Sequence, residues 1–161
     1  MAEKKIGVIG VGNTLRRDDG IGINLINHLK NEKDELSDFI KLIDAGIAGM
    51  NLLHMIEPFE TIIFIDAVNF DGKTGDLKTF SPEEVITLKK QGKENLTTHQ
   101  TDLLKIIEIF KKLNRDVDKK IYIIGIQPAD TSYGRNFSTG LDKKFSEITD
   151  NVIEEINKLS K

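Results

Sequence analysis

The sequence predicts a three-layer α/β/α fold built on a twisted, mostly parallel five-stranded sheet. Two observations predict it. Short β-branched runs alternate along the chain with longer segments whose apolar residues recur at helical spacing. The short runs are apolar at nearly every position, as strands buried on both faces are. The expected order is β-α-β-α-β-β-α-α-β-α, which places helices on both faces of the sheet. Residues 1–161 are expected to form a single domain, since domains typically span ~100–200 residues.

The first half of the chain contributes three of the predicted strands and two of the helices. The strands are apolar runs at residues 6–11, 39–43 and 61–68. The first helix is indicated by apolar residues at helical spacing: Ile21, Leu25, Ile26 and Leu29. The second helix is predicted over residues 48–56 and ends before Pro58, because proline cannot continue a helix.

The second half begins with a short strand at residues 77–80, a candidate antiparallel edge, which follows a glycine-rich turn. Ser81 and Pro82 then start a helix, as a capping serine followed by proline at the first helical position. A further amphipathic helix carries Leu103, Ile106, Ile107, Phe110 and Leu113. The last strand, a long loop and the final helix are predicted at residues 121–126, 127–140 and 141–159.

Composition excludes several classes of function. The net charge of −3 argues against electrostatic binding of nucleic acid or anionic membranes, which requires a basic surface. The absence of cysteine excludes disulfides, thiolate metal sites and cysteine nucleophiles. The apolar run at residues 6–11 is too short for a signal peptide or a membrane span. We therefore expect a cytoplasmic protein without membrane insertion, and a monomer because no exposed apolar stripe stands out.

Polar residues gather where the parallel strands are expected to end. Sites in such sheets form beyond the carboxyl ends of the strands, where the strand order switches. Residues 10–22 contain Asp18 and Asp19, Asp66 ends the central strand, and His99 precedes the long amphipathic helix. Residues 125–128 (Gly-Ile-Gln-Pro) follow the last strand and join them at the same edge.

One interpretation of the first loop is a nucleotide site. Gly10 and Gly12 resemble the start of a dinucleotide fingerprint, and Asp44 stands where an acid binding the ribose would be. Against this, Leu15 replaces the third glycine. The two aspartates at residues 18–19 would also repel a pyrophosphate at the helix N-terminus. The sequence therefore disfavours this interpretation.

Taken singly, these polar residues have ordinary structural explanations. One of the two aspartates at residues 18–19 would cap the following helix, Asp66 would accept loop N–H groups, and His99 would lie in a first helical turn. Taken together, two carboxylates and an imidazole at one edge form a plausible site for nickel, zinc, cobalt or manganese. Three protein ligands leave positions open for water or a substrate group.

The remaining sequence features offer no second catalytic site. His28 is expected on the solvent side of the first helix, and His54 is expected to pack at the edge of the second. No Gly-x-Ser-x-Gly elbow for a serine nucleophile is present.

Four sequence blocks resemble the hydrogenase maturation endopeptidases, the proteases that process [NiFe]-hydrogenase large subunits. The blocks are residues 10–22 (Gly-Val-Gly-Asn-Thr-Leu-Arg-Arg-Asp-Asp-Gly-Ile-Gly), 65–67 (Ile-Asp-Ala), 97–99 (Thr-Thr-His) and 125–128 (Gly-Ile-Gln-Pro). They occur in the family's order and at similar spacing. The last block is most similar to the branch acting on formate-hydrogenlyase-type and related energy-conserving hydrogenases.

The resemblance implies a fold and an activity. The fold is a twisted, mostly parallel five-stranded sheet between helices. The activity is that of an aspartic-type endopeptidase, which removes the C-terminal extension of the large-subunit precursor once nickel has been inserted. The family's metal-contacting and catalytic positions correspond to Asp19, Asp66 and His99. Nickel, carried by the precursor, is the implied metal, and zinc or cadmium is expected to replace it in vitro.

Three further residues and three alternative functions complete the predictions. Asn13, Asp18 and Gln127 are candidates for orienting the site or binding the substrate peptide. The alternatives are a non-catalytic binder of the nickel-loaded precursor, a nucleotide-binding module on the same fold, and a metallohydrolase of unrelated substrate with its own tightly held ion.

Overall fold

The structure is a computed structural model that describes residues 5–32, 35–47, 49–92 and 98–161, without the side chains of residues 89 and 98–101. Its sheet has five strands in the order β2-β1-β3-β5-β4. Four strands are parallel: β1 (Ile6–Gly10), β2 (Ile40–Asp44), β3 (Thr61–Ala67) and β5 (Lys120–Ile126). The short β4 (Leu77–Phe80) pairs antiparallel with β5, which confirms the predicted antiparallel edge.

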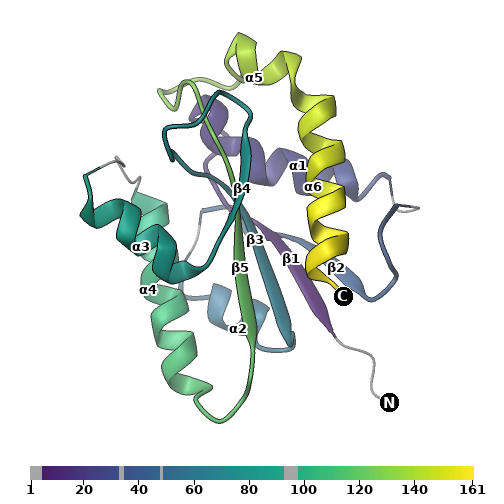
Figure 1. Ribbon diagram of the computed structural model, residues 1–161, viewed down its shortest axis with the longest axis vertical. Helices are drawn as coiled ribbons and strands as arrows, with labels where there is room; N and C mark the ends of the chain where they lie inside the picture. Colours follow the sequence, from purple (N-terminus) through teal and green to yellow (C-terminus); the bar gives the residue numbers. More distant parts are fainter. Residues whose placement is uncertain (1–4, 33–34, 48, 93–97) are drawn as a thin grey trace.

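Helices cover both faces of the sheet (Figure 1). They are η1 (Arg17–Gly20), α1 (Ile21–Leu29), α2 (Leu52–Ile56), α3 (Pro82–Lys90), α4 (Thr98–Leu113), α5 (Thr139–Lys143) and α6 (Phe145–Leu159). Apolar residues of α1, α5 and α6 share one core cluster with the sheet, and those of α2, α3 and α4 share the other. The predicted three-layer α/β/α architecture is therefore confirmed.

The central strand β3 explains why both faces need covering. All seven of its residues are buried. Ile62 and Phe64 point into the cluster of α2, α3 and α4, whereas Ile63 and Ile65 point into that of α1 and α6. Successive strand residues face opposite sides, so a strand with large apolar residues on both faces requires an apolar layer on each side.

Two predicted helix boundaries are wrong. The second helix begins at Leu52 rather than at residue 48, because the chain turns at Gly49, whose carbonyl accepts the Leu52 N–H at 2.9 Å. Ala48 itself lies outside the described residues. The final helix is divided into α5 and α6, because Lys144 has non-helical angles (φ −98°, ψ 1°) and its Nζ donates to the Thr74 carbonyl at 2.8 Å.

The parallel strands end together at the carboxyl edge of the sheet, where Gly10 lies beside Asp44 and Ile65, and Ala67 beside Ile126. This edge is at the top of Figure 1, near α5, and the amino edge is at the bottom.

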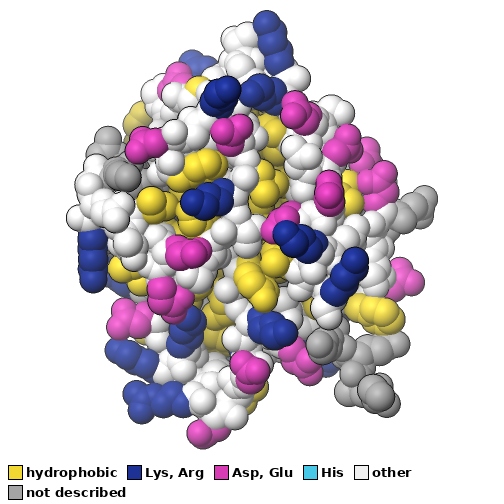
Figure 2. All heavy atoms as spheres, viewed as in Figure 1, with side chains coloured by type: hydrophobic (Ala, Val, Ile, Leu, Met, Phe, Trp, Pro, Cys, Tyr) yellow, Lys and Arg dark blue, Asp and Glu magenta, His cyan; other side chains and the backbone are white. Residues whose placement is uncertain are grey.

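On the face seen in Figure 2, basic and acidic side chains are intermixed, with apolar side chains visible between them. Among the described residues, none of the helices has the length and apolarity that spanning a bilayer requires.

Candidate functional site

The loop after β1 folds tightly over the carboxyl edge. A Cβ atom on Gly12 would lie 2.1 Å from the Asp19 carbonyl oxygen, and one on Gly22 would lie 2.1 Å from the Ile65 carbonyl oxygen. Any side chain at either position would therefore collide with backbone. These two glycines allow η1 and the start of α1 to lie directly against the ends of β1 and β3.

This packing brings Asp19 and Asp66 to the same edge of the sheet. Asp19 in η1 is fully buried, and its Oδ2 accepts the Asn13 N–H at 3.1 Å. Asp66 in β3 is 1% exposed, and its Oδ1 accepts the Ala67 N–H at 2.8 Å. Each carboxylate thus has one oxygen oriented by a backbone donor. Buried carboxylates held in this way are suited to binding a cation or accepting a proton.

His99 belongs to the first turn of α4, as its ordinary structural explanation expected, rather than to the segment before the helix. The strand that follows, β5, begins at the amino edge, so α4 runs from the carboxyl edge to the amino edge (Figure 1). The His99 backbone is therefore at the same end of the sheet as the two aspartates. Its side chain lies outside the described residues, so its approach to Asp19 and Asp66 stays a prediction. Among the side chains that are described, no three His, Asp or Glu residues could hold a metal ion together.

Asp18 organises the loop between β5 and α5. Its carboxylate accepts the N–H groups of Ala129 at 2.8 Å, Asp130 at 3.0 Å and Ser138 at 2.7 Å. It also accepts the Ser138 hydroxyl at 2.7 Å. The expectation that one of the two aspartates caps a helix is wrong, because neither η1 nor α1 has a side-chain cap. Asp18 is fully buried and holds this loop in place, and its role in orienting the site or binding the substrate stays a prediction.

Gln127 also acts within the protein. Its side-chain oxygen accepts the N–H groups of Phe70 at 2.8 Å and Gly72 at 3.1 Å, and its amide nitrogen donates to Asn69 Oδ1 at 3.0 Å. The side chain joins the end of β5 to the loop after β3 and is only 6% exposed. Asn13 is half-buried, and its Oδ1 accepts the Leu15 N–H at 3.0 Å, next to its own N–H bond to Asp19.

Ser138 is a contributor that sequence reasoning missed. Its hydroxyl accepts the Leu141 N–H and so caps α5, while its own N–H and hydroxyl donate to Asp18. The sequence signal for its capping role is a serine directly before a short helical segment. The long-range contact with Asp18 had no signature in the sequence.

The other histidines lie outside the site. His28 in α1 is half-buried: its ring packs edge-on against Phe145 at 5.4 Å, and its Nε2 lies 3.2 Å from Glu32 at the surface. His54 in α2 is exposed rather than packed.

The geometry also disfavours the nucleotide interpretation. Asp44 Oδ1 accepts the Gly46 N–H at 2.9 Å and closes a local turn. The missing side chain of Gly12 makes room for the Asp19 carbonyl, whereas in a dinucleotide fold the second glycine of the fingerprint admits the pyrophosphate.

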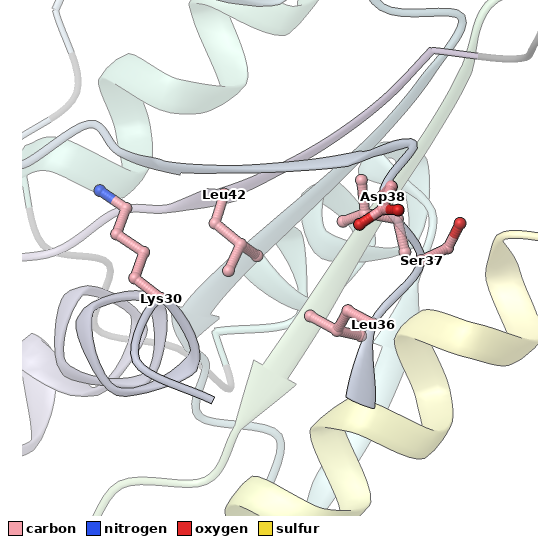
Figure 3. A pocket seen from close by; sticks show the side chains of 6 residues that line it. Lys30, Leu36, Ser37, Asp38 and Leu42 are labelled. Atoms are coloured by element: carbon pink, nitrogen blue, oxygen red, sulfur yellow. The ribbon is translucent and has the colours of Figure 1, made fainter. Parts of the chain in front are cut away.

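Cavities are found at the carboxyl edge, between α1 and α5, and along β2. One of about 330 Å³ adjoins the carboxyl edge beyond β2, with apolar walls from Ile47, Met50 and Met55. A second of about 420 Å³ lies between α1 and α5 and is lined in part by Arg135 and Asp142. A third of about 500 Å³ lies along β2, away from the carboxyl edge, and is lined by Lys30, Leu36, Ser37, Asp38, Ile40 and Leu42 (Figure 3).

Sequence comparison identifies the family. The family model described as hydrogenase maturation protease matches residues 23–159. The chain belongs to the hydrogenase maturation protease family. Its relatives there are named as proteases or as hydrogenase expression and formation proteins, so this is a family of peptidases acting in hydrogenase maturation.

Two relatives illustrate the range of similarity. A protein of Methanocaldococcus jannaschii, named "Putative hydrogenase maturation protease", is 29% identical over 96% of this chain and 95% of its own length. The hydrogenase expression/formation protein HupD of Bradyrhizobium diazoefficiens is 28% identical over 80% of this chain. The match spans only 65% of that longer protein.

Solved structures share the fold. The hydrogenase maturating endopeptidase HybD from E. coli superposes with a TM-score of 0.77 at 23% identity, covering 96% of this chain and 93% of HybD. The [NiFe] hydrogenase maturation protease HybD from Thermococcus kodakarensis gives a TM-score of 0.74 at 22% identity, covering 98% and 99% of the two chains. The predicted fold class is thus found in both.

Proposed function

We propose that this protein is an endopeptidase that removes the C-terminal extension of a [NiFe]-hydrogenase large-subunit precursor after nickel has been inserted. Membership of the family supports the reaction class. The observation that carries the proposal is the pair of buried carboxylates, Asp19 and Asp66, on separate elements at one edge of the sheet. Two carboxylates from separate elements that meet at the carboxyl edge of a parallel sheet support this proposal, because this edge is where such folds place their sites and because carboxylates are ligands for divalent ions.

In this proposal, Asp19, Asp66 and His99 dock on the nickel ion of the precursor. Carboxylate oxygen and imidazole nitrogen are suitable ligands for a divalent ion of this kind. The chain has no cysteine, and the precursor's own cysteines would supply the thiolate ligands. The ion is part of the substrate, so a precursor without nickel offers no anchor and is left uncut. Zinc or cadmium would serve as a substitute in vitro.

Cleavage then requires a water molecule, a base and a donor for the leaving amine. The water oxygen forms a bond to the scissile carbonyl carbon while a carboxylate accepts a proton from that water. The C–N bond then breaks, and the same proton passes to the leaving nitrogen. We assign this exchange to Asp19 or Asp66; a backbone N–H that orients one oxygen of each carboxylate supports the assignment. The nickel would polarise the carbonyl.

The deciding experiment incubates the purified protein with nickel-loaded and nickel-free precursor and compares the C-terminal masses. Tail loss from the loaded form alone is expected. Equal loss from both forms would contradict docking on nickel. Binding of the loaded precursor without tail loss would indicate a non-catalytic binder, and nickel that remains with the protein after the precursor is removed would indicate a metallohydrolase with its own ion.

The cellular setting is part of the same proposal. We expect the protein to act as a monomer in the cytoplasm, where the precursor would be its partner. Light scattering of the protein with and without precursor tests the monomer. A stable dimer in the absence of precursor would contradict it.

A further inference from the structure

The loop after β1 and the loop between β5 and α5 meet beside the candidate site. Arg16 and Gly134 form a parallel bridge, the Arg17 N–H donates to the Gly134 carbonyl at 2.9 Å, and the Gly134 N–H donates to the Leu15 carbonyl at 2.9 Å. We call the side chains of Leu15, Arg16, Arg17, Tyr133 and Arg135 the arginine rim. The bonds from Asp18 to the loop that follows β5 fix the rim to the buried part of the site.

The rim concentrates positive charge in a chain whose net charge is −3. The sequence has four arginines, at positions 16, 17, 115 and 135, and three of them are in the rim. The loop between β5 and α5 places one carboxylate near these arginines: Asp130 Oδ2 lies 3.6 Å from Arg17 Nε. Donation by the hydroxyl and N–H of Ser132 lowers the pKa of Asp130 below its usual value, so that it stays ionised. A second carboxylate, Asp142, lines the same cavity as Arg135.

The arginine and aromatic side chains of the rim are already ordered. The guanidinium of Arg16 lies over the Tyr133 ring, 5.3 Å from its centroid, and its Nε donates to the Thr131 carbonyl at 2.9 Å. A side chain held in place before binding loses less conformational entropy when a partner arrives. Arginine is also suited to carboxylates, because its planar group can donate two parallel hydrogen bonds.

The rim also exposes apolar surface next to the site. Tyr133 is 80% exposed and Leu15 is 55% exposed. Tyrosine and arginine together are typical of the residues that contribute most to protein interfaces. The rim is continuous with the carboxylates, because the Leu15 N–H bonds to Asn13, whose own N–H bonds to Asp19.

We propose that the arginine rim is the docking surface for the precursor protein and binds an acidic segment beside its cleavage site. This inference rests on the proposed function and adds the recognition element to it. The nickel ion identifies a precursor that is ready for cleavage, and the rim aligns its chain. Three arginines, of which Arg135 is exposed and Arg16 and Arg17 are half-buried, lie beside a tyrosine and a leucine. Such a surface suits a carboxylate-bearing protein segment with an apolar centre better than the repeating phosphates of a nucleic acid.

The test uses matched substitutions at opposite edges of the sheet. Arg16→Glu should raise KM for the nickel-loaded precursor about tenfold, with a smaller change in kcat. Arg115→Glu makes the same change of charge at an exposed residue of the amino edge and should leave KM unchanged. Leu15→Ala should raise KM, whereas Leu113→Ala should not, although Leu113 is 72% exposed. Equal effects at both edges would overturn the rim as the docking surface.

Ionic strength provides a second readout that needs no variant. KM of the unmodified protein should rise as salt is increased to about 0.5 M, where screening is strong, and Arg16→Glu should remove most of that rise. A KM independent of salt overturns the proposal even if Arg16→Glu does not fold. Competition by single-stranded RNA at precursor-like affinity would also overturn it. If the unmodified protein cuts no precursor, the proposed function fails instead, so the two failures are distinguishable.

Discussion

The two edges of the sheet use acidic residues differently. At the carboxyl edge, Asp18, Asp19 and Asp66 are at most 1% exposed, and their carboxylates accept backbone N–H groups. On the amino side, acidic residues pair with lysines at the surface: Glu83 of α3 bonds to Lys111 near the end of α4, and both side chains are largely exposed.

This difference shows what each kind of carboxylate contributes. A buried carboxylate with backbone partners fixes the course of a loop, because breaking its bonds leaves buried N–H groups unsatisfied. An exposed ion pair is screened by water and contributes about 0–1 kcal/mol. We therefore expect substitutions of the buried carboxylates at the carboxyl edge to have larger effects than substitutions of the exposed ion pair on the amino side. The predictions below test this contrast, beginning with the largest expected effect.

Asp19→Asn and Asp66→Asn should each lower precursor processing by about 1,000-fold, because the amide keeps the shape but loses the charge and the base. Mass spectrometry of the precursor tail measures the rate, and circular dichroism checks folding. Asp118→Asn, on the exposed loop before β5, is the matched control and should process normally. Normal rates in either site variant would remove that residue from the mechanism.

Gly22→Ala should destabilise the protein by about 3 kcal/mol, because its Cβ would lie 2.1 Å from the Ile65 carbonyl oxygen. Urea unfolding measures the free energy. Gly49→Ala is the control, since among the described residues, apart from its chain neighbours, no atom lies within 4 Å of a Cβ there. Similar stabilities for the two variants would show that the loop after β1 does not need close contact with β3.

Asp18→Asn should lower the free energy of unfolding by about 2 kcal/mol, because an amide NH₂ replaces an acceptor among four donors. Processing should fall as well, since the loop carrying Ser138 and the rim would lose its anchor. Asp116→Asn makes the same substitution at an exposed position and should change neither property. An Asp18 variant as stable as that control would contradict the anchoring role.

Glu83→Gln should have the smallest effect: it should lower the free energy of unfolding by about 0.5 kcal/mol at neutral pH. The hydrogen bond from Lys111 holds the pKa of Glu83 below its usual value. A carboxyl with a lowered pKa stabilises the fold above the pKa of the unfolded chain, and loses that contribution as the pH falls through its folded pKa. The free energies of unfolding of the variant and the unmodified protein should therefore become equal in acid. Urea unfolding at several pH values measures this, with Glu154→Gln on α6 as the exposed control; a difference that persists in acid would contradict it.

The sequence determined the architecture because the relevant signals are local. Strand β3 is apolar at both alternating sets of positions, which requires a helix layer on each face whatever the details of packing. Ser81 and Pro82 similarly marked the start of α3, where the Ser81 hydroxyl accepts the Glu84 N–H at 3.2 Å. The positions of Asp19 and Asp66 after β1 and at the end of β3 placed them at one edge, since parallel strands end together.

Only the tertiary structure decided which polar residues face inward and what they contact. Asp18 and Asp19 are neighbours with the same chemistry, yet one accepts donors from a loop more than a hundred residues away and the other from Asn13. The break of the final helix at Lys144 and the pairing of Arg16 with Gly134 likewise depend on segments distant along the chain. Local pattern cannot encode such contacts, because a hydrogen bond depends on the position of its partner in space rather than on its own neighbours in sequence.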